Sequence, residues 1–216
     1  MKKALIFYGG WSGHTPFETT QVFKNILEQN NFTVSVSDTM EILDTYENIE
    51  GYNLFVPMYT MGEISEKQMD NISKAIRNGA GIAGCHGGMC DAFRNNTEWQ
   101  FMTGAQWVAH PGNSEVTYTV HLKENTLFTE GLGDFNYTGE QYYLHVDPAV
   151  TVYATTDFPV FEGPHSANGK VSMPVIFTKK WGEGKVFYLS LGHSYKDFEI
   201  PEIKTIMKRG LLWAAK

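Results

Sequence analysis

Three histidines stand where predicted strands end. His14, His86 and His193 each follow an apolar segment of β type and each lies beside a glycine. Because the carboxyl ends of parallel strands share one edge of a sheet, we expect these imidazoles to converge there although they are far apart in sequence. Histidine titrates near neutral pH and can give or take a proton, so the convergence predicts acid–base chemistry. The alternative is three separate histidines, each exposed in a loop or packed against the backbone.

Two further residues are expected at the same edge. His110 precedes Pro111, which holds the loop extended whatever its function, and Glu140 precedes the aromatic pair Tyr142 and Tyr143. A carboxylate among aromatic rings is a common way to hold a sugar, although a solvated loop acid would look the same in sequence. The residues predicted to line one cleft are therefore His14, His86, His110, Glu140 and His193.

Cys85 lies in the most specific local motif, the segment Ala83–Gly88. Small residues on both sides of a strand-turn-helix junction are typical of a nucleophile elbow, with Cys85 at its centre. A thiolate near a helix N-terminus has a lowered pKa and is a strong nucleophile. A buried cysteine that packs as a small hydrophobe is the alternative. Cys90 is too far away for a CxxC motif and is predicted to be structural.

The aromatic residues near these groups indicate the kind of ligand. Trp11, Trp107 and Tyr142 are candidate stacking platforms for a pyranose, and with His14 they form the predicted substrate-binding set, although large aromatics also build cores. The loop Gly9–His14 contains neither GxGxxG nor a Walker lysine, and its tryptophan would obstruct the close approach that phosphates need. The expected ligand is a neutral carbohydrate, bound without a nucleotide or flavin.

No cofactor is predicted from the sequence. Histidines with a carboxylate do satisfy the ligand preferences of zinc or another divalent metal. No HExxH or His-x-His spacing supports such a site, so its ligands would have to come from separate loops.

In the first half of the chain, β-type runs alternate with amphipathic helices, which predicts an α/β fold with a parallel sheet covered by helices. Strands are expected at Ala4–Tyr8, Phe32–Val36, Tyr52–Met58 and Gly81–Gly84. One helix is expected to begin with Thr15 as its cap, Pro16 in its first turn and Glu18 completing a capping box. The pair Ser65 and Gln68 predicts a second capped helix.

The second half has a different pattern. Alternation of apolar and polar residues predicts strands at Val116–Leu122 and Val150–Ala154. Pro174–Leu191 is expected to form an antiparallel hairpin around a three-residue loop, Gly182–Gly184. A terminal amphipathic helix is predicted from Ile203 to Trp213.

Composition limits the classes of partner and location. The chain has 216 residues, 42% hydrophobic and 19% charged, which predicts a single domain over residues 1–216 with a substantial core. The net charge of −7 comes with no basic patch, so neither nucleic acid nor a membrane surface is an expected partner. Without a signal segment or a membrane-length apolar run, and with two cysteines, the chain is expected in the cytoplasm. The sequence leaves the oligomeric state open, and a homo-oligomer is compatible with it.

Five motifs together resemble the trehalose utilisation protein family, ThuA, over nearly the whole chain. They are Gly9–His14 (GGWSGH), Gly84–Gly88 (GCHGG), Ala109–Pro111 (AHP), Gly139–Tyr143 (GEQYY) and Gly184–His193 (GKVFYLSLGH). The resemblance implies a class I glutamine amidotransferase-like fold, which is a flavodoxin-like three-layer sandwich. Its mostly parallel sheet would carry helices on both faces and an antiparallel addition in the C-terminal half. It also implies a role in the utilisation of trehalose or a related sugar or keto-sugar.

The chain departs from this superfamily at two points. ThuA-like proteins generally lack the elbow cysteine and keep the adjacent histidine, so the resemblance favours His86 over Cys85. Amidotransferases need a His-x-Glu after the last long strand, whereas Ser194 and Tyr195 follow His193, so glutamine hydrolysis is not expected.

Three functions remain open on sequence. The first is a sugar-processing enzyme that uses His86, His110, Glu140 and His193. The second is a non-catalytic sugar-binding or interaction module. The third is a hydrolase that depends on Cys85.

Overall fold

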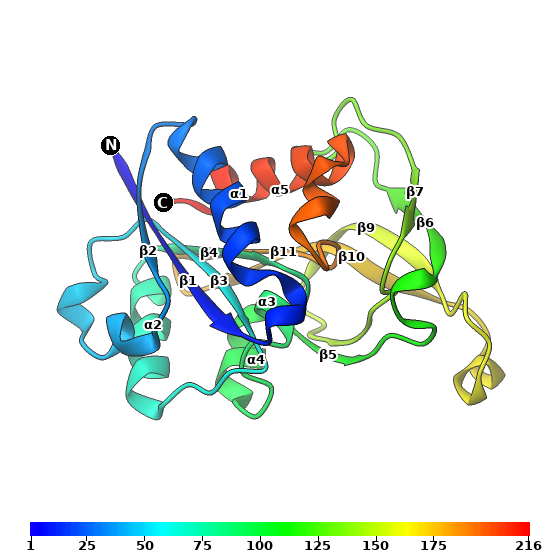
Figure 1. The fold of residues 1–216 in the computed structure, drawn as a ribbon, viewed down its shortest axis with the longest axis horizontal. Coiled ribbons are helices and arrows are strands. Elements are labelled where there is room, and N and C mark those ends of the chain that lie inside the picture. Colours follow the sequence, from blue (N-terminus) through cyan, green and yellow to red (C-terminus); the bar gives the residue numbers. More distant parts are fainter.

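A nine-stranded mixed sheet runs through the computed structural model, which describes all of residues 1–216 (Figure 1). In spatial order its strands are β2 (Phe32–Ser37), β1 (Lys2–Gly10), β3 (Leu54–Thr60), β4 (Gly81–Cys85), β11 (Gly184–Leu189), β10 (Val171–Trp181), β9 (Thr151–Phe158), β6 (Thr117–Leu122) and β7 (Phe135–Thr138). Two further strands, β5 (Ala105–Ala109) and β8 (Tyr143–Val146), form a separate antiparallel ribbon.

The sheet changes character at β11. From β2 to β11 all neighbouring strands pair in parallel. From β11 to β7 all pairings are antiparallel. The expected mixed α/β fold is confirmed, and the carboxyl ends of β1, β3, β4 and β11 meet at one edge.

Helices cover both faces of the parallel half. On one face lie α1 (Pro16–Glu28) and α5 (Pro201–Ala214), and on the other lie α2 (Glu66–Arg77), α3 (His86–Cys90) and α4 (Thr97–Thr103) (Figure 1). The remaining helical turns are short 3-10 segments at Ser12–His14, Met40–Leu43, Tyr46–Asn48, Asn113–Glu115, Pro164–Asn168 and Tyr195–Glu199. None of the helices combines the length and apolar character that a membrane crossing needs.

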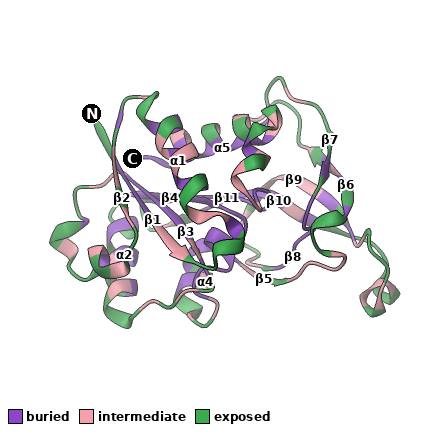
Figure 2. Cartoon of the chain, in the orientation of Figure 1, coloured by how far each residue is buried: buried purple, intermediate pink, exposed green.

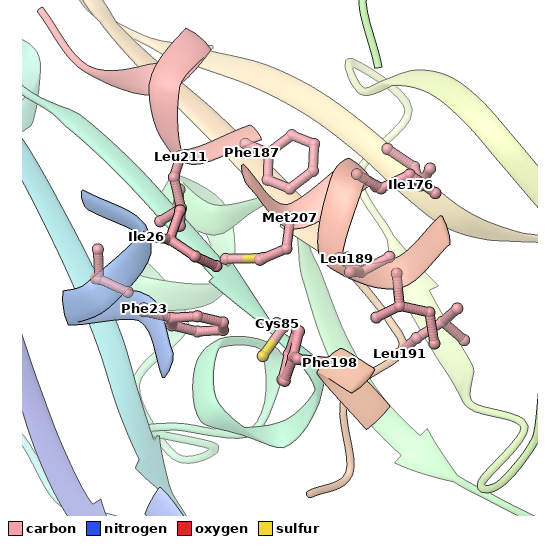
Figure 3. Close-up of a cluster of buried hydrophobic side chains, with 14 of the residues drawn as sticks. Phe23, Ile26, Cys85, Ile176, Phe187, Leu189, Leu191, Phe198, Met207 and Leu211 are labelled. Atoms are coloured by element: carbon pink, nitrogen blue, oxygen red, sulfur yellow. The ribbon is translucent and has the colours of Figure 1, made fainter. Parts of the chain in front are cut away.

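Two hydrophobic cores follow from the two-residue period of the strands. Along β11, Phe187 and Leu189 face α1 and α5, whereas Val186 and Tyr188 face the opposite layer. Figure 3 shows the first core, in which Phe187 lies among α5 side chains, and Figure 2 shows the central strands buried and the outward faces of the helices exposed. Burial on both faces explains why these strands are continuous apolar runs in sequence.

The predicted helices form, although their starts differ in detail. The capping box of Ser65 and Gln68 is present, with Ser65 Oγ accepting from the Gln68 amide at 3.2 Å. At α1 Thr15 is the N-cap residue as predicted, but the predicted capping box with Glu18 is absent, because Thr15 has a positive φ of 45° and its side chain makes no cap hydrogen bond. Pro16 nevertheless opens the helix, since a first-turn position needs no amide hydrogen.

The hairpin of β10 and β11 has a tighter loop than predicted. Trp181 pairs with Gly184, so the connection is the two residues Gly182 and Glu183 and not three. Gly182 has φ +57°, which a two-residue hairpin loop commonly requires at its first position. The sequence does not predict strands β5, β7 and β8, because they are only four or five residues long.

We expect Phe187→Ala to lower the free energy of unfolding by about 3–5 kcal/mol, because it opens a cavity in the core under α5. Urea denaturation measures this change. Lys208→Ala, on the exposed face of α5, is the matched control and should stay within about 0.5 kcal/mol. Equal effects of the two substitutions would contradict the assignment of the core.

Candidate functional site

The elbow at the end of β4 presents His86. This residue has φ +47°, whereas Cys85 is extended with φ −136°, so the centre of the elbow is His86 and the prediction that Cys85 occupies it is wrong by one position. The Tyr188 hydroxyl donates to the His86 carbonyl at 3.2 Å and holds the turn. A Cβ on Gly87 would lie 2.5 Å from the His14 ring, so only glycine allows the two imidazoles to approach.

Cys85 lies in the hydrophobic core instead of the cluster. Its side chain is completely buried, and Figure 3 shows its sulfur beside Phe198 and Phe23. Burial raises the pKa of the Cys85 thiol well above its ordinary value, which keeps it protonated. The residue therefore has the environment of a structural cysteine. Cys90 is also buried and free.

Glu140 is the centre on which the histidines converge. Its Oε2 lies 3.0 Å from His86 Nε2 and 3.4 Å from His193 Nδ1, and its Oε1 lies 3.7 Å from His110 Nε2. The carboxylate is buried, and the Glu140 carbonyl accepts from the Tyr118 hydroxyl at 3.0 Å. One acidic side chain in the loop between β7 and β8 thus meets three imidazoles from other segments.

His14 completes the group from the loop after β1. Its ring centroid lies 4.8 Å from that of His86 and 5.0 Å from that of His193. His14 Nδ1 lies 2.8 Å from the Thr60 hydroxyl at the end of β3, while its Nε2 is buried without a partner. The structure therefore brings together all five predicted residues, His14, His86, His110, Glu140 and His193, although only His14 and His110 line the cavity beside them.

The charges in this cluster are unevenly distributed. Burial, with the other imidazoles, lowers the pKa of His14 to about 3, and burial also lowers the pKa of His86. The Glu140 carboxylate raises the pKa of His193. Burial alone would raise the pKa of Glu140, but its contacts with His193 and His86 hold it well below its usual range. In the protein alone, Glu140 is therefore ionised and His14 is neutral at pH 7.

The ion pair of Asp91 and Arg94 beside the site is not predicted from the sequence. Arg94 Nε and Nη2 donate to the two Asp91 carboxylate oxygens at 3.0 and 2.7 Å. Asp91 is buried and Arg94 lies over the Trp107 ring at 5.2 Å. The only available signal was an acid and an arginine three residues apart, which is common on any surface.

A cavity of about 220 Å³ opens beside the cluster. Its lining residues are Trp11, His14, Thr60, Met61, Asp91, Arg94, Trp107, His110 and Tyr142. Trp11 is 45% exposed, and its ring meets His14 edge-on at 4.7 Å. Tyr142 is instead buried, and its ring is stacked on that of His86 at 4.0 Å between centroids. It therefore packs against the imidazole and is less suited than Trp11 to stack on a sugar ring.

Several polar residues lie outside this site. His165 contacts the Phe161 carbonyl in an exposed segment, and His121 pairs with Asp134 on the surface. Asp147 forms an ion pair with Lys179 at 2.6 Å. None of these belongs to the Glu140 cluster.

Four side chains could hold a metal ion. One ligand atom from each of His14, His86, Glu140 and His193 lies within 4.8 Å of the others. Three imidazoles and a carboxylate are a donor set suited to zinc and related divalent metals.

Fold and site together define an α/β protein with a polar cluster at the carboxyl edge of its parallel strands. The family model described as ThuA, trehalose utilisation, matches residues 3–214. The chain therefore belongs to the ThuA family.

Solved structures share the fold at low sequence identity. A ThuA-like protein from Bacteroides uniformis is 18% identical with a TM-score of 0.77, covering 99% of this chain and 91% of that one. A ThuA-like protein from Parabacteroides merdae is 18% identical with a TM-score of 0.76, covering 100% and 90%. A protein from Salmonella typhimurium described as cytoplasmic is 13% identical with a TM-score of 0.70, covering 99% and 100%. No curated protein sequence matches the chain.

The buried neutral His14 generates a pH prediction for protein freed of divalent ions by EDTA. Because the pKa of His14 is lowered from 6.5 to about 3 on folding, the unfolded chain takes up this proton first as the pH falls. We expect His14 to contribute a loss of stability of roughly 1 kcal/mol per pH unit between pH 6.5 and 4.5.

Urea denaturation across this range, with His14→Gln as the comparison, measures the contribution. The variant should show the shallower dependence on pH whatever its absolute stability. Identical slopes for the two proteins would mean that His14 is not held neutral by burial.

Proposed function

We propose that this protein is an enzyme that acts on trehalose or a related sugar or keto-sugar through its Glu140 cluster. The observation that carries the proposal is that three imidazoles share one buried carboxylate directly beside a cavity with tryptophan walls. Paired titrating groups are needed for catalysis and not for simple sugar binding, which favours an enzyme over a binding module.

His110 is the residue best placed to exchange a proton with the substrate. It lines the cavity and is partly exposed, with Nε2 toward Glu140 Oε1 at 3.7 Å. Its Nδ1 has no hydrogen-bond partner. The carboxylate contact orients the imidazole beside the cavity, as a histidine that exchanges a proton with a ligand requires. The reaction class is proton transfer at a sugar hydroxyl or next to its carbonyl.

The cavity offers a neutral sugar both apolar ring faces for stacking and a hydrogen-bond donor for its hydroxyl groups. Trp11 and Trp107 supply apolar faces on which a pyranose ring can stack. Two of the guanidinium nitrogens of Arg94 are engaged by Asp91, which leaves Nη1 to bond a hydroxyl. The guanidinium charge is balanced by Asp91, so the cavity is suited to an uncharged ligand.

Two further parts of the proposal are the flavodoxin-like arrangement of the domain and its location in the cytoplasm. The strand order β2-β1-β3-β4-β11 with parallel pairing supports a flavodoxin-like arrangement within one domain over residues 1–216. The free thiols of Cys85 and Cys90, and structural neighbours from Salmonella described as cytoplasmic, support action in the cytoplasm.

The role of His110 is tested by measuring the rate at which the protein converts trehalose, glucose and their keto derivatives, with NMR of the sugar as the readout. We expect His110→Ala to lower the rate about 100-fold, because the group that exchanges the proton is lost. Cys85→Ala should stay within a few fold, since its thiol is in the core. Loss of turnover in the Cys85 variant with an unchanged His110 variant would support the hydrolase alternative.

The sugar site is tested by thermal shift and by calorimetric titration with the same free sugars. We expect stabilisation by a free sugar and none by nucleotides or phosphosugars. Trp11→Ala should weaken sugar binding roughly tenfold through the lost stacking face. Phe161→Ala, another exposed aromatic outside the cavity, is the control and should bind normally. Stabilisation by nucleotides or phosphosugars alone would contradict the proposal.

A further inference from the structure

His86 lies between two groups that only accept hydrogen bonds. Its Nδ1 is 2.8 Å from the Ser190 carbonyl oxygen, and its Nε2 is 3.0 Å from Glu140 Oε2. A neutral imidazole carries one N–H, so it can donate to one of these oxygens and not to both. With Nδ1–H donated to Ser190, the Nε2 lone pair faces the carboxylate oxygen across a buried space. A positive charge between the two atoms satisfies both, either as a second proton on the imidazole or as a metal ion.

His14 points to the same place from another loop. The Thr60 hydroxyl can accept from its Nδ1–H at 2.8 Å, which leaves the lone pair on Nε2. That nitrogen is buried in a side chain only 4% exposed, and it has no hydrogen-bond partner. Leaving a buried polar atom unpaired destabilises the folded protein, so an occupant that pairs with it would stabilise the protein.

His193 offers a second buried nitrogen without a hydrogen-bond partner. Its Nδ1 lies 3.4 Å from Glu140 Oε2 but makes no hydrogen bond. Ligand atoms around a tetrahedral zinc ion are about 3.3 Å apart, given bonds of about 2.0 Å. The contacts of 3.0 and 3.4 Å at Glu140 Oε2 bracket that spacing.

We infer that His14, His86, Glu140 and His193 bind one divalent transition-metal ion of the zinc type. Imidazole nitrogens favour zinc, cobalt and nickel over magnesium and calcium, which prefer oxygen. The Ser190 carbonyl on His86 and the Thr60 hydroxyl on His14 are the outer hydrogen bonds that metal-binding histidines usually make. His110 contacts the other carboxylate oxygen and remains outside the ligand set.

The inferred ion would lie beside the sugar cavity, since His14 belongs to both. A metal there would supply Lewis-acid chemistry to a hydroxyl or carbonyl oxygen that entered its coordination shell as a further ligand. The inference uses the site of the proposed function, but its test measures metal binding and not turnover. Either can therefore fail alone.

The test uses the full chain without a histidine tag, stripped with EDTA and dialysed. We expect calorimetric titration with Zn²⁺ to give about one equivalent per chain, mass spectrometry of the desalted protein to retain it, and Co²⁺ to produce the visible spectrum of a nitrogen-ligated cobalt site. The melting temperature should rise with Zn²⁺, because the ion binds the folded state.

Variants locate the ion. Glu140→Gln, which keeps the side-chain shape, and His193→Ala, at a partly exposed position, should each weaken zinc binding about 100-fold or more. Thr60→Val should weaken it roughly tenfold by freeing the His14 ring. His121→Ala and His165→Ala, outside the cluster, are the controls and should bind zinc as the natural chain does.

Two outcomes would overturn the inference. One is that none of Zn²⁺, Co²⁺ and Ni²⁺ is retained in stoichiometric amount. The other is zinc binding that is unchanged in both Glu140→Gln and His193→Ala, as verified on variants whose circular dichroism matches the natural chain. Metal binding without sugar turnover would count against the proposed function alone, and sugar turnover with no metal binding would count against the metal site alone.

Discussion

The whole site depends on one buried carboxylate that must be kept charged. Glu140 is largely removed from water, and an ionised carboxylate in that position is costly unless positive or hydrogen-bonding groups surround it. The groups around the carboxylate are imidazoles from loops distant in the sequence. The Tyr118 hydroxyl holds the loop by donating to the Glu140 backbone carbonyl. The loops around Glu140 must therefore bring these groups together, and the positions of those loops are fixed by the strands of the sheet.

Parallel pairing provides that geometry. Because β1, β4 and β11 run in the same direction, their ends deliver His14, His86 and His193 to one edge. The antiparallel half of the sheet supplies the carboxylate, since the turn after β7 carries Glu140 to that edge. Gln141 holds this turn, as its amide donates to the Thr156 hydroxyl and the Asp157 carbonyl at 3.0 Å each. The two halves of the sheet thus meet in the cluster.

The convergence of His14, His86 and His193 can be predicted from sequence, because it depends only on apolar runs that end beside glycines. The centre of the elbow cannot be predicted in the same way, because a sequence does not show which residue takes the positive φ. The small residues around Cys85 favour the cysteine, whereas the structure assigns that angle to His86. The hydrogen-bond partners that orient the histidine rings cannot be predicted from sequence. The partner of His86 is the backbone carbonyl of Ser190, and the partner of His14 is Thr60, which no motif distinguishes from the other threonines. The Asp91–Arg94 pair was missed for the same reason.

A crystal grown with zinc and measured at the zinc absorption edge would locate the ion itself. We expect one anomalous peak at about 2.0–2.2 Å from His86 Nε2 and from a Glu140 carboxylate oxygen, with His14 and His193 completing the shell. No anomalous peak in the cluster, with His86 still in direct contact with Glu140, would contradict it and leave a cluster held together by protons alone.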